Sequence, residues 1–130
     1  MAHEGYHEPF EKLSEPTRMM HRALESLMEE LEAIDWYYQR AEVTDDEALK
    51  AILLHNAHEE IEHAFMTLEW IRRHDKSFDL NMRTYLFREG DIVAGEKTAK
   101  AEVAQSVAPV AVVTTVRRSL GSLRNDRSDA

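Results

Sequence analysis

Glutamate and histidine side chains at helical spacing are the most chemically distinctive pattern in this sequence. Glu60 and His63 are three residues apart, and Glu30 lies in an earlier segment of helical character. Four-helix carboxylate proteins hold two metal ions with one glutamate from each of two helices and a Glu-x-x-His pair from each of the other two. Glu30, Glu60 and His63 therefore supply half of a di-iron ligand set.

Apolar periodicity predicts a first long helix that carries Glu30. Ser14 is expected to cap it, Pro16 falls in its first turn, and it runs to about Ala41, some 40 Å at 1.5 Å per residue. Intervals of three and four residues, typical of one helix face, separate Met20, Leu24, Leu27, Leu31, Ile34 and Tyr38.

A second long helix is predicted to run to about Asp75, and it carries Glu60 and His63. Its start is indicated by a capping box in which Thr44 bonds forward and Glu47 bonds back. The face at helical spacing consists of Leu49, Ile52, Asn56, Glu60, His63, Thr67, Trp70 and His74. The middle of this face is polar where a core helix would be apolar, which favours an interface site.

A short turn near residues 42–45 makes the two helices antiparallel neighbours. Residue 45 is midway between positions 30 and 60, so the hairpin is expected to bring Glu30 level with Glu60. A two-helix hairpin has too little core to be stable alone. Two hairpins about a two-fold axis would form a four-helix bundle and duplicate every ligand. The alternative is that Glu60 and His63 are surface residues, because Glu-x-x-His is common in helices.

The rest of the chain is predicted to be less regular. Residues 1–13 are expected to form a flexible arm, residues 14–90 the helical hairpin domain with a short third helix around 79–88, and residues 91–116 a flexible linker. Residues 117–130 form a basic tail. The fold class is all-α, an antiparallel hairpin with a short C-terminal helix, completed as a bundle by dimerisation.

Composition narrows the range of partners. The chain has 25 acidic and 16 basic residues, for a net charge of −9, and 15 of the acids but only 5 of the bases precede residue 61. An acidic first half disfavours nucleic acid and anionic membranes and attracts cations. With no cysteine, metal ligands are limited to histidine, carboxylate and water. No signal peptide or membrane-spanning run is apparent, so a cytoplasmic protein is expected.

Other polar residues near the set admit two interpretations. Glu29 and Glu32 flank Glu30, and they either collect Fe²⁺ at the mouth of the site or form a solvated acidic face. His55 and His58 each precede a glutamate by four residues, so surface pairing on the helix is favoured over metal binding.

Several segments resemble the encapsulated ferritins. The similarity runs from about His7 to Glu89, and it is carried by residues 29–37, 59–64, 66–70 and 83–87. From Ser119 to Arg124 the tail resembles the cargo-loading peptide that docks such proteins inside encapsulin nanocompartments. It departs from the usual Leu-Gly-Ile-Gly-Ser-Leu form, since Leu120 replaces the isoleucine and Arg118 stands where an upstream leucine is expected.

The resemblance implies a ferroxidase that oxidises Fe²⁺ with O₂ at a di-iron centre between two subunits of a ferritin-like bundle. It implies Glu30, Glu60 and His63 as iron ligands and Glu29 and Glu32 as the point where iron enters. It also implies that two aromatic residues lie close to the centre, namely Trp36 and Tyr37. A ring of dimers, commonly a decamer, would work inside the encapsulin shell, which stores the mineral.

Two other functions fit the same residues. In one, a non-enzymatic helical oligomer uses the ligands as a structural site for Zn²⁺ or Ca²⁺, because ligand type alone does not choose between metals. In the other, a small helical interaction module acts through its tail.

Overall fold

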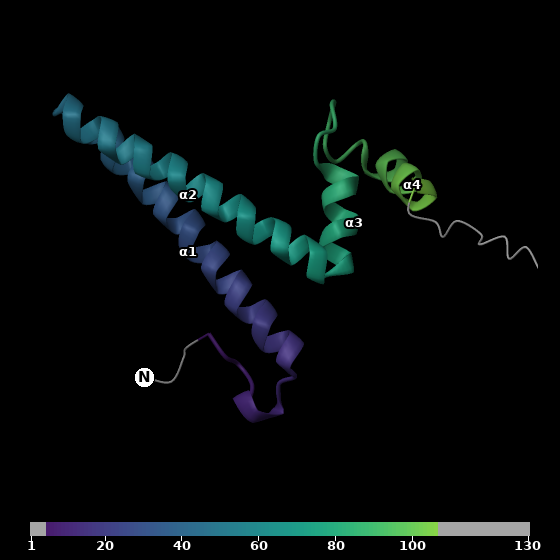
Figure 1. The fold of residues 1–130 in the computed structure, drawn as a ribbon. Helices are drawn as coiled ribbons and strands as arrows, with labels where there is room; N and C mark the ends of the chain where they lie inside the picture. Colours follow the sequence, from purple (N-terminus) through teal and green to yellow (C-terminus); the bar gives the residue numbers. More distant parts are fainter. Residues whose placement is uncertain (1–4, 107–130) are drawn as a thin grey trace, which may run out of the picture.

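The computed structural model describes residues 5–106, and all of their regular structure is helical (Figure 1). A 3₁₀ turn, η1, spans Phe10–Lys12. The four α-helices are α1 (Glu15–Val43), α2 (Glu47–His74), α3 (Lys76–Tyr85) and α4 (Glu96–Ser106). The predicted all-α class is confirmed.

Helices α1 and α2 form the predicted antiparallel hairpin, with α3 packed on α2 and α4 on α3 (Figure 1). The side chain of Ser14 caps α1 by accepting the Thr17 N–H at 3.4 Å, and Pro16 lies in the first turn. These two features were predicted, and they set where the first long helix begins.

The cap of α2 differs from the prediction. Asp46, not Thr44, is the N-cap, and its carboxylate accepts the Leu49 N–H at 2.8 Å. The Thr44 hydroxyl instead donates to the Arg40 carbonyl at the end of α1, at 2.5 Å. Thr44 thus satisfies an orphan carbonyl of the first helix, which leaves Asp46 to satisfy the orphan amides of the second.

The buried side chains of the two long helices are three alanines and one isoleucine. Ala41 of α1 is buried, and α2 buries Ala57, Ala64 and Ile71 at intervals of seven residues. This buried line is one position beyond Asn56, His63 and Trp70 of the predicted face. The predicted face therefore lies beside the intrachain contact, and its Leu49 and Ile52 are 47% and 56% exposed.

Charged residues join the end of α2 to α3. Arg72 pairs with Glu69 at 2.6 Å and with Asp79 at 2.5 Å, Arg73 also contacts Glu69, and Arg83 contacts Asp79. Hydrogen bonds from Arg72 and Arg73 lower the pKa of Glu69 to about 2. Arg83 and Arg72 likewise lower the pKa of Asp79. This cluster fixes the corner at which α3 turns away from the hairpin.

The third helix begins earlier than predicted. The Asp75 carboxylate accepts the N–H groups of Ser77 and Phe78 and caps α3, which ends at Tyr85. The prediction placed this helix at 79–88. Asp75 both ends α2, where its N–H donates to the Ile71 carbonyl, and caps α3, so the third helix follows the second directly.

A further helix, α4, replaces part of the predicted linker. It buries Ala99 and Val103 four residues apart, and Glu96 forms an ion pair with Lys100 at 2.5 Å. Alanine has the highest helix propensity, and the Glu-to-Lys spacing of four adds support. The rest of the linker and the tail, residues 107–130, lie outside the described residues.

Residues 5–13 also differ from the flexible arm that was predicted. The Arg18 side chain donates to the Phe10 carbonyl and lies over the Phe10 ring, at 3.9 Å from its centre. The Tyr6 ring lies 4.2 Å from the imidazole of His21. This segment therefore packs on the first turns of α1.

Candidate metal centre

Glu60 and His63 lie one turn apart on α2 and contact each other. The Glu60 Oε2 atom is 3.3 Å from His63 Nδ1. The two side chains are 28% and 46% exposed, respectively. A carboxylate and an imidazole at this spacing can bind the same metal ion, and their exposure leaves room for ligands from elsewhere.

Glu30 lies on α1, and its two carboxylate oxygens differ. Oε1 accepts a hydrogen bond from the Thr67 hydroxyl at 3.1 Å. Oε2 is inaccessible to solvent and has no hydrogen-bond partner among the described residues. A buried carboxylate oxygen without a partner is costly, and a bound cation would satisfy it. The chemistry of the Glu30, Glu60 and His63 side chains therefore suits a divalent metal.

The hairpin does not bring Glu30 into contact with the Glu60–His63 pair. Helical side chains lean toward the N-terminus of their own helix. Glu30 thus leans away from the turn and Thr67 leans toward it, so Glu30 meets Thr67, seven residues beyond Glu60. Within residues 5–106 no three acidic or histidine side chains come together as a metal site. Glu30 and Glu60 are equally far from the turn in sequence, which predicted that their side chains would lie side by side. In the structure Glu30 contacts Thr67 instead.

The other predicted site residues lie on the same helix as Glu30. Glu29 and Glu32 are exposed on α1. Trp36 and Tyr37 lie further along the same helix, and the Arg40 guanidinium is 5.8 Å and 5.6 Å from the centres of their rings. Their place near a metal stays a prediction.

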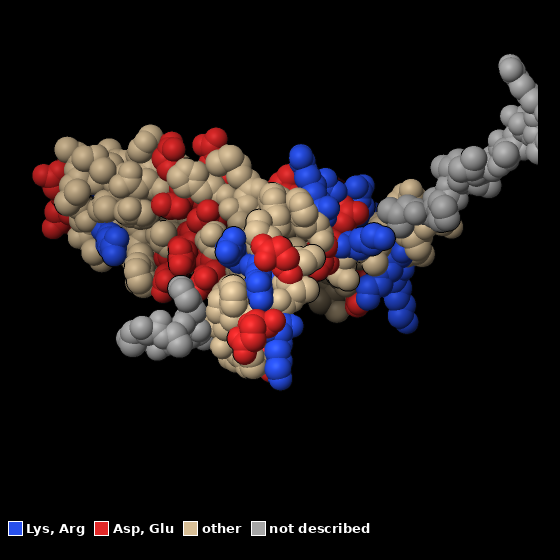
Figure 2. Space-filling view, turned by 60° about the horizontal axis from the view of Figure 1, so that its bottom comes forward, with Lys and Arg blue, Asp and Glu red and all other residues tan. Residues whose placement is uncertain are grey.

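The surface charge is distributed unevenly. Acidic side chains predominate toward the α1–α2 turn, and basic side chains toward α3 and α4 (Figure 2). His55 pairs with Glu59 at 3.7 Å, and both side chains are more than half exposed. This is one of the two surface pairings that the sequence favoured over a metal site, and no ion pair joins His58 to Glu62 among the described residues.

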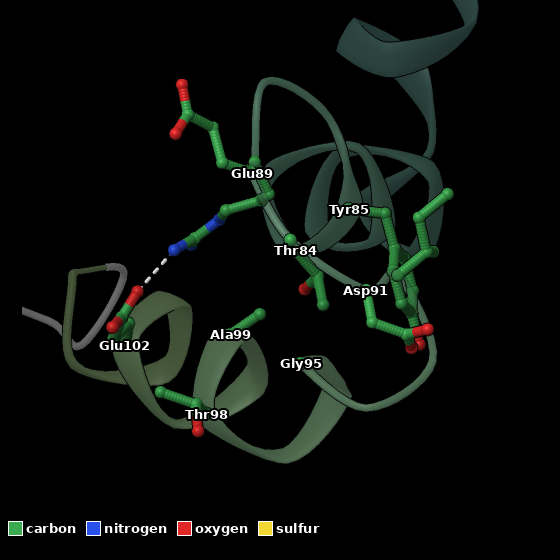
Figure 3. Close-up of a pocket in the computed structure, with 11 residues that line it drawn as sticks. Thr84, Tyr85, Glu89, Asp91, Gly95, Thr98, Ala99 and Glu102 are labelled. Atoms are coloured by element: carbon green, nitrogen blue, oxygen red, sulfur yellow. Dashed lines mark hydrogen bonds and ion pairs between the residues drawn. The ribbon is translucent and has the colours of Figure 1, made fainter.

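A cavity of about 210 Å³ lies away from these residues, between α3 and α4 (Figure 3). Thr84 and Ala99 line it, and Arg88 pairs with Glu102 beside it. No predicted ligand lines this cavity. The predicted ligands Glu60 and His63 lie instead on a partly exposed face of the hairpin.

Thr67 is the residue whose role the sequence did not reveal. It lies on the polar face of α2, seven residues after Glu60, and a threonine at this spacing does not by itself indicate a function. The sequence feature that could have indicated its contact with Glu30 is the hydroxyl at position 67, where an apolar side chain would be expected in a helix core.

Within residues 5–106, none of the helices combines the length and the apolar character needed to cross a bilayer.

Comparison with known proteins gives consistent matches. The profile of the EncFtn-like family matches residues 5–89. The chain is 58% identical over 90 residues to an encapsulated ferritin-like protein of Rhodospirillum rubrum, covering 69% of this chain and 64% of that protein. It is 49% identical over 94 residues to a ferritin-like protein of Thermotoga maritima, covering 72% of this chain and 82% of that protein.

A solved structure has the same fold. The crystal structure of a protein from Nitrosomonas europaea superimposes with a TM-score of 0.67 at 56% sequence identity, covering 68% of this chain and 98% of that one. The family profile spans most of the chain, and it includes both long helices and α3. The chain therefore belongs to the EncFtn-like family, as the resemblance to encapsulated ferritins predicted.

Proposed function

We propose that this protein is a ferroxidase that oxidises Fe²⁺ with O₂ at a di-iron site shared by two subunits. The observation that carries the proposal is the presence on the hairpin of three side chains that are suited to bind metal but do not form a complete site within residues 5–106 of one chain. Glu60 and His63 lie 3.3 Å apart with exposed surface, and Glu30 has a buried oxygen that lacks a partner among the described residues. The names of the Rhodospirillum rubrum and Thermotoga maritima relatives support an iron-related role.

Exposed apolar side chains support a second copy of the hairpin as the source of the other ligands. Leu49 and Ile52 precede Glu60 on α2, and Met66, three residues after His63, is 60% exposed. Leu31, next to Glu30, is 53% exposed. A small hairpin with this much exposed apolar surface gains stability by covering it. A two-fold axis would add a second Glu30, Glu60 and His63 to the same site.

The proposed dimer balances the charge of the substrate. Four carboxylates offset the charge of two Fe²⁺ ions, and two imidazoles complete the ligand set. Each Fe²⁺ gives one electron to O₂, so two adjacent ions supply a pair of electrons. Glu29 and Glu32 are exposed beside Glu30 and would draw Fe²⁺ toward the site by charge.

The same proposal extends to the assembly. The relative in Rhodospirillum rubrum is named an encapsulated ferritin-like protein. We propose that dimers of this chain form a ring, commonly a decamer in such proteins. The tail from Ser119 to Arg124 would dock it inside an encapsulin shell in the cytoplasm. These tail residues lie outside the described residues, so their support comes from the sequence.

A matched pair of variants tests the activity. Glu60→Ala removes a proposed ligand, whereas Glu59→Ala removes its exposed neighbour, which pairs with His55. In the full-length assembled protein, initial rates of O₂-dependent Fe²⁺ oxidation should fall at least 10-fold for Glu60→Ala, in the range found for lost metal-site interactions. Glu59→Ala should stay near wild type. Equal rates in the wild type and Glu60→Ala would rule out this site.

The same experiment distinguishes the ferroxidase from the alternative of a non-enzymatic oligomer with a structural metal site. A protein that uses Zn²⁺ or Ca²⁺ only to assemble would form its oligomer with either ion and leave added Fe²⁺ unoxidised. The chemistry of the ligands accepts all three ions. Oxidation at the wild-type site favours the ferroxidase.

A further inference from the structure

The Thr67 side chain contacts the proposed ligand on the opposite helix. Its hydroxyl donates to Glu30 Oε1 at 3.1 Å, and the contact is partly buried. The other oxygen of the same carboxylate, Oε2, is buried without a partner among the described residues. One oxygen of Glu30 is therefore held from α2, whereas the other makes no hydrogen bond to the described residues.

The direction of the Thr67 hydroxyl is informative. Threonine hydroxyls within a helix often bond to the carbonyl four residues earlier. Thr84 does so, donating to the Leu80 carbonyl at 2.7 Å. The Thr67 hydroxyl instead donates to the Glu30 carboxylate, so this hydrogen bond links α2 to α1.

The Thr67 hydroxyl restricts the conformations that the Glu30 side chain can adopt. An unrestrained glutamate side chain samples several rotamers, and ordering it on metal binding costs conformational entropy. A hydroxyl that holds Oε1 restricts the carboxylate before metal arrives and leaves the lone pairs of Oε2 for the ion. Residues that orient metal ligands in this way tune affinity without touching the metal.

We propose that Thr67 is a positioning residue for the iron site, which orients the Glu30 carboxylate so that Oε2 faces the metal. This inference rests on the proposed ferroxidase function, because it takes Glu30 as an iron ligand. A purely structural role for Thr67 would satisfy Glu30 and leave metal binding unaffected.

Cobalt titration of the full-length assembled protein tests the proposal. Co²⁺ binds the same ligand types, its visible absorption reports ligand geometry, and its binding does not depend on oxidation. Thr67→Val and Thr67→Ala both remove the hydroxyl, and the alanine variant adds no bulk if valine prevents folding. Thr67→Ser keeps the hydroxyl. Thr98→Val, at an exposed position on α4, is the matched control.

Loss of the hydroxyl should weaken Co²⁺ binding about 10- to 100-fold and alter the absorption band. Thr67→Ser and Thr98→Val should bind as the wild type does. Unchanged Co²⁺ affinity in both hydroxyl-free variants would overturn the proposal, even if their melting temperatures fell. If Co²⁺ affinity were unchanged in those variants but Glu30→Ala and Glu60→Ala still abolished Co²⁺ binding, the role of Thr67 would be rejected and the ferroxidase proposal would remain. If these two variants also bound normally, both proposals would fall.

Discussion

At the residue scale, the proposed ligands differ in how the hairpin holds them. Glu60 and His63 contact each other on an exposed face, whereas Glu30 is bonded by Thr67 and partly buried. The residue types and the spacing of three predicted the first pair. The contact between Glu30 and Thr67 could not be predicted, because it depends on the lean of two side chains across a helix contact.

The ion pairs of Glu69 with Arg72 and Arg73 are expected to stabilise the fold less at low pH. The folded-state pKa of Glu69 is about 2, below the ordinary value of 4.5, so folding favours the ionised carboxylate. Its contribution is present above about pH 4.5 and is lost as the pH falls toward 2. Glu69→Gln should therefore melt at a lower temperature than the wild type at pH 7, and the gap should narrow from pH 5 to pH 2.

Circular dichroism melts across this pH range measure the gap directly. Glu62→Gln is the control, since Glu62 is an exposed glutamate of the same helix without an ion pair in residues 5–106. A gap between Glu69→Gln and the wild type that stays constant from pH 7 to pH 2 would contradict the role of Arg72 and Arg73 as its cause.

At the element scale, the long helices could be predicted and their exact limits could not. Periodicity placed both, and Ser14 was identified as the first cap. Thr44 and Asp46 compete for the second cap, and the outcome depends on the end of α1, where Thr44 bonds to Arg40. Helix α4 was missed because it lacks an amphipathic period, although its alanines and the Glu96–Lys100 pair favour a helix.

The cap of α2 can be tested by a neighbouring pair of substitutions. Asp46→Ala removes the acceptor for the Leu49 N–H and should lower the free energy of unfolding by about 0.5–2 kcal/mol. Asp45→Ala removes an exposed carboxylate one residue earlier and should have a smaller effect. Urea denaturation of the two variants at equal protein concentration measures the difference, and equal losses would show that Asp46 is not the cap.

At the scale of the whole molecule, the hairpin of one chain has little core of its own. The hairpin buries three alanines and one isoleucine, and it leaves Leu49, Ile52 and Met66 exposed on α2. The sequence predicted that a second copy completes the bundle, because two long helices cannot supply a four-helix ligand set, and this stays a prediction. The placement of two copies depends on contacts between surfaces, which the periodicity of one chain does not determine.

Native mass spectrometry of the Fe²⁺-loaded protein under anaerobic conditions tests the central claim, that two subunits share the site. The wild type should carry two irons for each pair of chains. Ile52→Asp places a charge on the exposed face beside the ligands, and its monomers should carry none. Ala51→Asp, on the face shared with His55 and His58, should behave as the wild type does. Monomers of Ile52→Asp that bind iron at the wild-type ratio would contradict the account.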